Sequence, residues 1–409
     1  MRKMKKMTKL EQLINDLCPN GVEYKKLGEV ALVTKLAGFE FTNYVKYSDT
    51  GSIIALRGLN VKNGNLDLRD VKYIDNSDFS KLSRSKLVKG DMLFTYVGTI
   101  GEVALIQEND KYYLAPNVAL IRIREQLIPR FLMYCFQTNQ FYTSQIGKLL
   151  QSSSMKNIPM EKIRKFIVPV PPLEVQAEIV KVLDNFTELT AELTAELTAE
   201  LTARKKQYEY YRDRLLNFGV RGGAKYERIW KPLKDIAENC DSKRKPVTKG
   251  DRASGIYPYY GASGIVDYVD DYIFDGDYLL VSEDGANLLA RSTPIAFSIS
   301  GKNWVNNHAH VLKFETYVTR RFVEIYLNSI NLEKYISAAA QPKLTQDNLN
   351  KIPIPVPPLE EQERIVSILD RFDKLCNDIS EGLPAEIEAR RKQYEYYRDK
   401  LLSFEEVKA

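Results

Sequence analysis

The chain has 409 residues, of which 44% are hydrophobic and 28% charged, and its formal net charge is +5. This composition is typical of a globular protein of roughly two to four domains and excludes an intrinsically disordered chain. No apolar run approaches the roughly 20 residues that span a bilayer. The basic start, Met1–Lys6, is followed by polar residues, and the cysteines (Cys18, Cys135, Cys240 and Cys376) are scattered. We therefore expect no secretion signal and no disulfide framework, but a cytoplasmic protein.

A long internal repeat sets the expected architecture. Residues Lys206–Asp213 and Lys392–Asp399 both read Lys-Gln-Tyr-Glu-Tyr-Tyr-Arg-Asp, at an offset of 186 positions. The same offset relates Pro171–Glu174 to Pro357–Glu360, which both read Pro-Pro-Leu-Glu. Because one offset holds across both motifs, two segments of equal length are duplicated.

Each repeated segment predicts a long helix, over 173–218 and 359–404. The Pro-Pro pair suits a helix start. Apolar residues follow it at helical spacing in the first copy: Leu173, Ile179, Val180, Leu183 and Phe186. Three Thr-Ala-Glu-Leu units then occupy 190–201. The second copy instead carries Gly382 and Pro384, which predict a kink or a break.

The regions between these helices are less alike and are expected to be rich in β-structure. Their β-forming runs are separated by Gly, Asn and Asp. These runs are Gly51–Leu56, Met92–Val97, Val118–Ile123, Tyr278–Val281 and Val311–Phe314. We predict an α+β fold with a pseudo-twofold internal repeat, in which β-rich domains at 1–170 and 219–356 alternate with helices at 171–218 and 357–409.

Charge is divided between the helices and the globular regions. Residues 173–218 hold six basic and nine acidic residues, and residues 359–404 hold eight and eleven. Each helix therefore carries −3, and the rest of the chain carries +11. A polyanion is expected to bind the globular regions.

Motifs of the common enzyme classes are absent from the sequence. It contains no Gly-x-x-x-x-Gly-Lys-[Ser/Thr] phosphate loop, no Gly-x-Ser-x-Gly turn and no adenine-methyltransferase tetrapeptide. His308 and His310 would share one face of a strand and could ligand one metal. Since no other His or nearby Cys accompanies them, we expect strand residues, or one side chain that reaches DNA. The chain is predicted to be non-catalytic and to hold no metal.

The duplicated Tyr-rich motif has two interpretations. Its aromatic rings pack two related helices together, or they form a docking surface, because Tyr and Arg are enriched at interface hot spots. Identity over eight residues exceeds what a core requires, so a docking site for two identical partners is favoured. The residues concerned are Tyr208, Tyr210, Tyr211, Arg212, Tyr394, Tyr396, Tyr397 and Arg398.

The Thr-Ala-Glu-Leu array also has two interpretations. It is helix filler of good intrinsic propensity, or it is a ruler in which each unit adds about 6 Å of helix. The ruler is favoured because the array joins two regions that are expected to bind DNA.

This pattern resembles the DNA specificity subunit of type I restriction–modification systems. The resemblance covers nearly the whole chain. It rests on two dissimilar domains alternating with near-identical helices, on the Thr-Ala-Glu-Leu array, and on Pro-Pro-Leu-Glu-x-Gln at 171–176 and 357–362. Gly90, Asp91, Gly98, Gly101 and the segment Ser153–Ile158 add family-like features. The absence of the array from the second helix departs from the pattern, so the ruler is argued for the first helix alone.

The resemblance implies two target-recognition domains, each reading one half of a split site in double-stranded DNA. The helices would pack antiparallel into a coiled-coil spacer that sets the gap and docks two methyltransferase (modification) subunits. No cofactor is expected in this chain. S-adenosylmethionine would belong to the methyltransferase subunits, and ATP and Mg would belong to motor-nuclease (restriction) subunits.

Candidate DNA contacts are polar or basic residues in turns near the expected strands. There Lys and Arg would hold phosphates and a few side chains would reach base edges. The candidates are Arg57, Arg84, Lys86, Tyr96, Thr99, Lys243, Arg244, Lys245, Arg252, Tyr259, Asn307, His308, Gln341 and Lys343. A solvated surface residue is the alternative for each. For the whole chain, the alternative is a helical scaffold, or an assembly protein that binds DNA without sequence preference.

Overall fold

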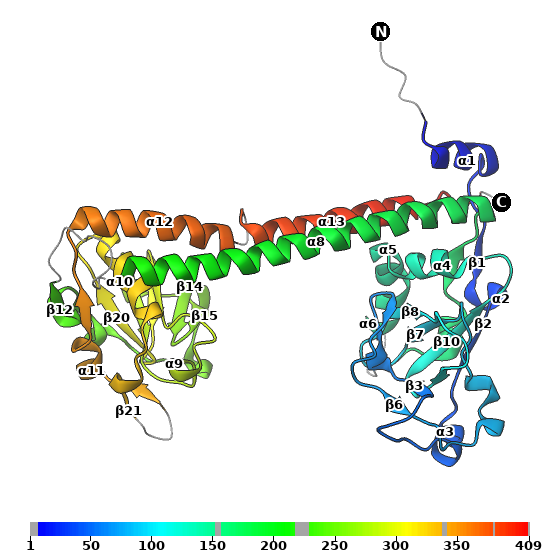
Figure 1. Cartoon of the computed structure of the whole chain (residues 1–409), viewed down its shortest axis with the longest axis horizontal. Helices are drawn as coiled ribbons and strands as arrows, with labels where there is room; N and C mark the ends of the chain where they lie inside the picture. Colours follow the sequence, from blue (N-terminus) through cyan, green and yellow to red (C-terminus); the bar gives the residue numbers. More distant parts are fainter. Residues whose placement is uncertain (1–6, 152–156, 217–228, 338–341, 379–380, 408–409) are drawn as a thin grey trace, which may run out of the picture. The chain divides into compact units, whose positions relative to one another are not determined.

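The chain forms two compact units, each of which combines a globular domain with helical segments from both repeats. The computed structural model describes residues 7–151, 157–216, 229–337, 342–378 and 381–407 (Figure 1). Unit 1 comprises Met1–Glu196 and Ile387–Ala409, and unit 2 comprises Leu197–Glu386. Among the described residues, no helix has the length and apolar character needed to cross a membrane.

Unit 1 is built on a four-stranded antiparallel sheet with the strand order β2-β10-β7-β8, beside a smaller sheet, β6-β3-β9. Its strands are β1 (Tyr24–Lys26), β2 (Ala31–Lys35), β3 (Ile54–Leu56), β4 (Val61–Lys62), β5 (Asn65–Leu66), β6 (Lys72–Tyr73), β7 (Met92–Thr95), β8 (Val103–Leu105), β9 (Tyr112–Leu114), β10 (Val118–Ile123) and β11 (Ile167–Pro169). Its helices are α1 (Lys9–Leu17), α2 (Leu27–Val30), α3 (Gly38–Tyr44), α4 (Pro129–Phe136), α5 (Asn139–Phe141), α6 (Lys148–Gln151) and α7 (Met160–Ile163), together with the first part of α8 (Leu173–Leu216).

Unit 2 has a corresponding central sheet, β13-β20-β17-β18, and a second sheet, β15-β14-β19-β16. Its strands are β12 (Trp230–Pro232), β13 (Glu238–Asn239), β14 (Ser254–Gly261), β15 (Gly264–Val269), β16 (Phe274–Asp275), β17 (Tyr278–Ser282), β18 (Ala296–Ile299), β19 (Lys302–Val305), β20 (Ala309–Lys313), β21 (Ile336–Ser337), β22 (Lys343–Leu344) and β23 (Pro353–Pro355). Its helices are α9 (Asn287–Ala290), α10 (Tyr317–Ser329), α11 (Gln346–Asn350) and α12 (Leu359–Asn377), and α13 (Leu383–Leu401) begins here. The predicted run at Val118–Ile123 is β10, and the other four runs overlap β3, β7, β17 and β20.

The start of each repeated helix packs into the core of its own domain. Ile179 and Leu183 of α8 are fully buried in unit 1, and Ile365 and Leu369 of α12, at the same repeat positions, are fully buried in unit 2. The first and last residues of the predicted stripe do not follow this pattern, and the last, Phe186, is 38% exposed. Leu173 is 47% exposed because it lies at the end of the helix, before the stripe reaches the core.

The repeated helices pair antiparallel within each unit, as predicted. In unit 2 the Tyr211 ring stacks on Phe372 of α12 at 5.6 Å. Lys205, which is earlier in α8, lies close enough to Cys376, which is later in α12, for its charge to oppose the rise in the pKa of that thiol that burial causes. In unit 1 the hydroxyls of Thr187 and Tyr394 are 2.9 Å apart. As residue numbers increase along one helix, those of the residues it contacts decrease, so the two helices run antiparallel.

The predicted break in the second helix is present. Helix α12 ends at Asn377 and α13 begins at Leu383, which places Pro384 in the first turn of α13. A Cβ atom at Gly382 would lie 2.6 Å from the carbonyl oxygen of Asp378. The break therefore needs glycine at this position, and proline is tolerated because a first-turn residue needs no helical N–H bond.

Candidate nucleic-acid interface

The segment 241–252, which we call the basic loop, follows β13 in unit 2 and carries four of the predicted DNA contacts. Lys243 and Lys245 are exposed, as is Lys249, which the sequence did not single out. Among the described residues, the structure shows no ion pair for these three lysines. Arg244 and Arg252 are half-buried and bind neighbouring acidic groups. The loop thus presents lysines to solvent and uses its arginines to hold its own shape.

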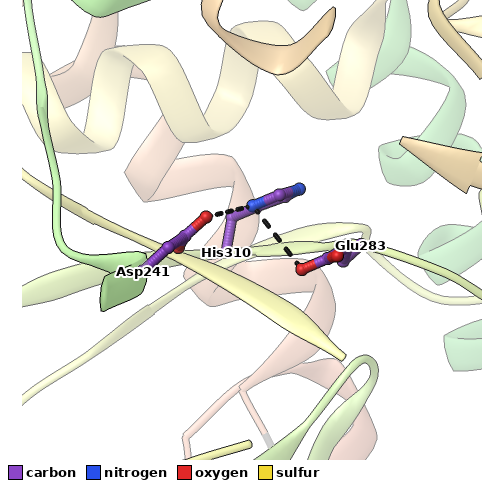
Figure 2. A group of neighbouring side chains, drawn as sticks. All are labelled: Asp241, Glu283 and His310. Carbon is purple, nitrogen blue, oxygen red and sulfur yellow. Dashed lines mark hydrogen bonds and ion pairs between the residues drawn. The ribbon is translucent and has the colours of Figure 1, made fainter. Parts of the chain in front are cut away.

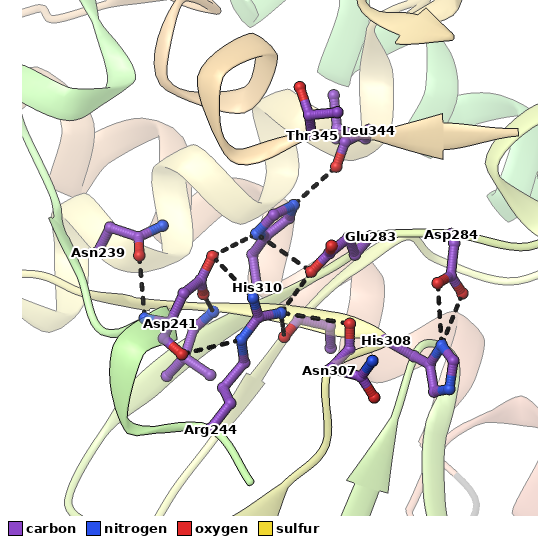
Figure 3. Close-up of polar contacts among 12 residues, drawn as sticks. Asn239, Asp241, Arg244, Glu283, Asp284, Asn307, His308, His310, Leu344 and Thr345 are labelled. Atoms are coloured by element: carbon purple, nitrogen blue, oxygen red, sulfur yellow. Dashed lines mark hydrogen bonds and ion pairs between the residues drawn. The ribbon is translucent and has the colours of Figure 1, made fainter. Parts of the chain in front are cut away.

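Arg244 lies in a buried ion-pair network (Figure 3). Its Nη1 donates to Glu283 Oε2 at 2.5 Å, and its Nη2 lies 3.3 Å from Asp241 Oδ2. His310 Nδ1 is 2.6 Å from the same Oδ2 of Asp241, and His310 Nε2 donates to the carbonyl oxygen of Leu344 at 2.8 Å. The network joins the basic loop to β20, to β22 and to Glu283, which directly follows β17, so it fixes where the loop begins.

Both carboxylates of this network are stabilised in their charged form. Burial by itself raises the pKa of Asp241, but hydrogen bonds from His310 and the Val311 N–H hold that pKa below its ordinary value. Burial also opposes ionisation of Glu283, and its partners Arg244 and Lys343 hold its pKa below the ordinary value. The negative charges of Asp241 and Glu283 therefore stabilise the network at neutral pH.

Asp241, Glu283 and His310 offer ligand atoms that all lie within 4.8 Å of one another (Figure 2). The trio has the composition of a metal site. However, Arg244 and Lys343 already neutralise the two carboxylates, with Lys343 Nζ 3.0 Å from Glu283 Oε1. A divalent cation would have to displace both side chains and leave two cations beside it. We therefore describe the trio as part of an ion-pair network.

The two histidines have different environments. His310 lies in β20 and is fully buried, whereas His308 precedes the strand and its side chain is 48% exposed. His308 Nδ1 is 2.9 Å from Asp284 Oδ2. The geometry for sharing one metal is thus absent, because only one of the two is in the strand. Asn307 and Lys343 are exposed near this site, and Gln341 lies outside the described residues.

Arg252 and Tyr259 support the hairpin formed by β14 and β15. The Arg252 guanidinium lies over the Tyr259 ring at 4.4 Å, and its Nη1 is 3.0 Å from Asp267 Oδ2. Tyr259 is 1% exposed, and its hydroxyl accepts a hydrogen bond from the Val247 N–H. This tyrosine, predicted as a DNA contact, is covered by its neighbours and is placed to brace the loop against the hairpin.

The cationic candidates of unit 1 lie on its surface loops. Arg57 is held by Asp70, with Nη2 to Oδ1 at 2.8 Å, and Lys86 pairs with Asp110 at 2.6 Å. Arg84 is exposed, and its Nη2 is 3.5 Å from the Thr34 hydroxyl. Phosphate groups would compete with Asp70 and Asp110 for the first two cations.

The other two candidates of unit 1 follow β7. Tyr96 is 9% exposed and belongs to the core, with Lys35 Nζ 5.4 Å from its ring centre. Thr99 is exposed, and its carbonyl oxygen accepts a hydrogen bond from the Thr95 hydroxyl. Tyr96 is thus placed to position Lys35, a residue that the sequence did not single out.

Part of the Tyr-rich motif packs the helices together. In the first copy, Tyr208 is half-buried and Tyr211 stacks on Phe372. In the second copy, Tyr394 bonds Thr187, and the Tyr397 ring lies 6.2 Å from the Phe186 ring. The packing interpretation therefore holds for these four tyrosines.

The remaining tyrosine of each copy faces solvent. Tyr210 is 58% exposed and Tyr396 is 60% exposed. The motif arginines contact other rings of the motif: Arg212 lies over the Tyr208 ring at 5.9 Å, and Arg398 over the equivalent Tyr394 ring at 5.8 Å. Tyr211 and Tyr397 are also exposed, at 36% and 43%, and their rings lie 5.4 Å from those of Tyr210 and Tyr396. Each copy thus presents the same ring, Tyr210 or Tyr396, as its most exposed one.

A duplicated contact that the sequence analysis missed anchors each domain to its helix. Arg130 Nε donates to Asp184 Oδ1 at 2.8 Å, and Arg321 Nε donates to Asp370 Oδ1 at 2.7 Å. The two aspartates are 186 positions apart, and an Arg-Phe pair supplies both arginines. The Asp repeated at the 186-residue offset and the Arg-Phe pair found in each half were the available signal. In unit 1, burial and a hydrogen bond to Asp184 raise the pKa of Tyr134 to about 12.

Two domains with the same sheet order, joined to duplicated helices and carrying exposed lysines, are the features of a duplicated DNA reader. Comparison with known proteins gives the family. The profile of the type I restriction modification DNA specificity domain matches residues 19–203 and 229–389. Since these ranges cover more than half of the chain, the protein belongs to this family and is a specificity subunit, the non-catalytic component of a type I restriction–modification system.

Individual relatives agree. The chain is 34% identical to the type I restriction enzyme EcoprrI specificity subunit of Escherichia coli over 337 residues, which cover 77% of this chain and 80% of that protein. A Haemophilus influenzae protein named for the same subunit class is 41% identical over 182 residues, or 44% of this chain and 47% of that protein. The crystal structure of the HsdS subunit from Thermoanaerobacter tengcongensis is 17% identical, with a TM-score of 0.53 over 94% of this chain and 96% of that one. This last likeness supports the α+β fold.

Proposed function

We propose that the chain recognises a bipartite DNA site, reading one half with the domain at 1–170 and the other with the domain at 219–356. The observation that supports this proposal best is the repeated attachment of two domains, alike in their central sheet but different in their second sheet, to equivalent helix positions through Arg130–Asp184 and Arg321–Asp370. Because both domains are attached to their helices in the same way, each can present its own DNA-binding surface from an equivalent position on its helix. Two linked readers can bind one duplex when their half-sites lie about one helical turn apart.

Methylome sequencing tests this function. In cells that carry the chain and its partner subunits, we expect adenine methylation at one bipartite motif, and its loss when the chain is deleted. Complementation by the intact gene is the control. A methylation pattern that does not depend on the chain would contradict the proposal, and so would a purified chain that methylates or cuts DNA alone. DNA binding that is lost in moderate salt and shows no sequence preference would support a scaffold instead.

We further propose that the Thr-Ala-Glu-Leu array sets the gap between the half-sites. The array lies inside the uninterrupted helix α8. Four residues add about 6 Å of helix, which is less than two base-pair steps of about 3.4 Å. Deletion of residues 194–197 should keep both half-motifs and shorten the gap by one or two base pairs. The same-length double variant Glu192→Gln with Glu196→Gln is the matched control and should keep the gap. An unchanged gap in the deletion variant would exclude the ruler.

The exposed tyrosines are proposed to dock two methyltransferase subunits. The same ring at the same repeat position, 58% and 60% exposed, suits two copies of one partner. Tyr210→Ala combined with Tyr396→Ala should reduce co-purification of that partner at least tenfold while the chain remains folded. Leu189→Ala, at a residue 61% exposed on α8 outside the motif, is the control. Retention of two partner copies by the double variant would exclude this surface.

The chemistry is proposed to reside on partner subunits. S-adenosylmethionine would bind the methyltransferase subunits, and ATP and Mg would bind the motor-nuclease subunits. Because the four cysteines are free, which fits a reducing compartment, we place the chain in the cytoplasm. Isothermal titration of the isolated chain with S-adenosylmethionine should show no binding, and heat of binding would contradict this assignment.

A further inference from the structure

The hairpin of β14 and β15 in unit 2, which we call the ribbon, exposes apolar side chains along much of its length. Ile256 is 79% exposed, Ile265 48%, Val266 55% and Tyr268 51%. β15 is the edge strand of its sheet, and its one charged residue, Asp267, is engaged by Arg252. Exposed edge strands are normally protected by charge or covered. An unprotected apolar edge of this kind indicates a surface that meets a partner.

The ribbon is held in place at two points. Near its middle, where Tyr259 pairs with Asp267, Arg252 binds Asp267 and stacks on Tyr259. At its turn, the Ser282 hydroxyl donates to the carbonyl oxygen of Ala262 at 2.5 Å. Ser282 directly precedes Glu283 of the ion-pair network. The exposed residues therefore project from a fixed element that is tied to the basic loop.

Two β-bulges aim the exposed side chains. The pairing of β14 with β15 shifts between Ser254 and Tyr257, and again between Tyr259 and Tyr260. Ile256 lies within the first irregularity, and Val266 is the unpaired residue of the second. A bulge inserts a residue that strand pairing does not constrain and redirects its side chain. Local irregularities in strand pairing therefore determine the orientation of Ile256, the most exposed residue, and of Val266, which lies near the turn.

Cations border the ribbon. Lys249 lies close enough to Asp267 to help hold the pKa of that carboxyl below its ordinary value, after the stronger hydrogen bond from Arg252. The Lys245 carbonyl oxygen accepts a hydrogen bond from Trp304 of β19 in the same sheet. A partner that contacts the ribbon would therefore meet apolar groups beside the positive charge of the basic loop. Duplex DNA has this complementary pattern, with thymine methyl groups in the major groove between two rows of phosphates.

We propose that the ribbon enters the major groove and that Ile256, Ile265 and Val266 read thymine methyl groups in one half of the site. The major groove admits a two-stranded ribbon, and apolar side chains discriminate thymine by contact with its C5-methyl group. Lys243, Lys245 and Lys249 of the basic loop contact phosphates beside the groove and set the register. This assignment rests on the proposed function and adds the element and the chemical group that it reads.

Replacement of thymine by deoxyuridine tests the assignment, because it removes the methyl group and preserves base pairing. The complex of this chain with its methyltransferase subunits is titrated with duplexes carrying the motif found by methylome sequencing. The wild-type complex should bind about fourfold more weakly for each methyl that the ribbon contacts, given about 0.8 kcal/mol per buried CH2 group. Ile256→Ser, Ile265→Ser and Val266→Ser should each bind thymine and deoxyuridine duplexes more equally.

Two controls separate the possible roles. Leu289→Ser, at a residue 50% exposed on α9 of the same unit, should keep the wild-type preference for thymine. Lys245→Ala should weaken binding to both duplexes equally and lower the salt dependence by about one phosphate contact.

Several results would overturn the assignment. They are equal binding of thymine and deoxyuridine duplexes by the wild-type complex, a motif half without any A·T pair, and serine variants that keep the thymine preference. A change of oligomeric state in the serine variants would instead assign the ribbon to contacts between copies of the chain. Failure of the proposed function itself is distinguishable, because then no methylation motif would depend on this chain.

Discussion

The two units hold their helices through similar contacts but differ at the end of the central sheet. Arg130 and Arg321 bind aspartates at equivalent repeat positions. At the sheet end, Tyr96 and Glu283 are equivalent, because each backbone accepts a hydrogen bond from the segment before the next repeated helix, from Ile158 or Leu344. In unit 1 this position is an aromatic ring under a lysine, whereas in unit 2 it belongs to an ion-pair network.

This difference separates two kinds of constraint. The anchor joins a domain to a helix that is nearly the same in both copies, so one solution serves twice. The sheet end supports the loops that are proposed to face DNA, and two half-sites of different sequence need different surfaces. Variants that act on one unit and not on the other can therefore test whether the anchors are equivalent and whether the sheet ends differ as described.

The largest expected effect comes from the anchor of unit 2. Arg321→Ala should lower the free energy of unfolding of unit 2 by about 3–5 kcal/mol, because it leaves Asp370, Asp373 and the buried Glu324 without their shared cation. Unfolding in urea can be followed by tryptophan fluorescence, since the chain's two tryptophans, Trp230 and Trp304, are both in unit 2.

The equivalent change in unit 1 should cost less. Arg130→Ala is expected to lower stability by about 1 kcal/mol, because the side chains of Arg130 and Asp184 are 32% and 43% exposed and Tyr134 still binds Asp184. Hydrogen exchange of peptides from α4 measures this effect. Equal losses from the two variants would show that burial does not distinguish the two anchors.

An effect between those of the two anchor variants is expected at the sheet end of unit 2. His310→Ala should cost about 2–3 kcal/mol, because it removes two buried hydrogen bonds and leaves Asp241 and the Leu344 carbonyl with fewer partners. His308→Ala, two residues away and 48% exposed, should change stability by less than about 0.5 kcal/mol. Similar losses from both variants, measured by tryptophan fluorescence in urea, would contradict the distinction between a buried network and a surface histidine.

Much of this fold could be predicted from local signals, but the sheet-end network could not. The Pro-Pro helix starts, the break near Gly382 and strand β10 depend on residues close in sequence. By contrast, Asp241 and His310 are 69 positions apart, and their contact depends on strand pairing that no sequence pattern revealed. Tyr96 was predicted as a surface residue because a polar hydroxyl near a turn suggests exposure. It is buried because the strand before it, β7, is covered on both faces.

The starts of α8 and α12 should lose different amounts of stability when the equivalent glutamine of each, Gln176 or Gln362, is replaced. Gln176 donates to the carbonyl oxygens of Pro171 and Gln126 and accepts from the Ile128 N–H. Gln362 donates to the Pro357 carbonyl, while its Oε1 has no hydrogen-bond partner among the described residues. Gln176→Ala should therefore cost about 2 kcal/mol and Gln362→Ala about 1 kcal/mol. Hydrogen exchange at the two helix starts measures both, and a larger loss in unit 2 would contradict this order.

The smallest expected effect is a change in pH dependence at the sheet end of unit 2. The pKa of Glu283 is held below its ordinary value of 4.5, so the folded state binds a proton less readily than the unfolded state does. The resulting stabilisation is present above pH 4.5 and is lost as the pH falls through the lowered pKa. Asp241 adds a contribution of the same sign, which is lost below its ordinary value of 3.8.

Glu283→Gln removes the first contribution. Its midpoint of urea unfolding, followed by tryptophan fluorescence, should fall less between pH 6 and pH 3.5 than the wild-type midpoint does, although the variant is less stable at pH 6. Glu333→Gln, an exposed glutamate in the same unit, serves as the control and should keep the wild-type slope. Parallel pH curves for Glu283→Gln and the wild type would mean that Arg244 and Lys343 do not stabilise the charged form of this carboxyl. The sheet end of unit 2 would then be held by packing, as the corresponding position of unit 1 is, and the contrast between the two units would be one of shape and not of charge.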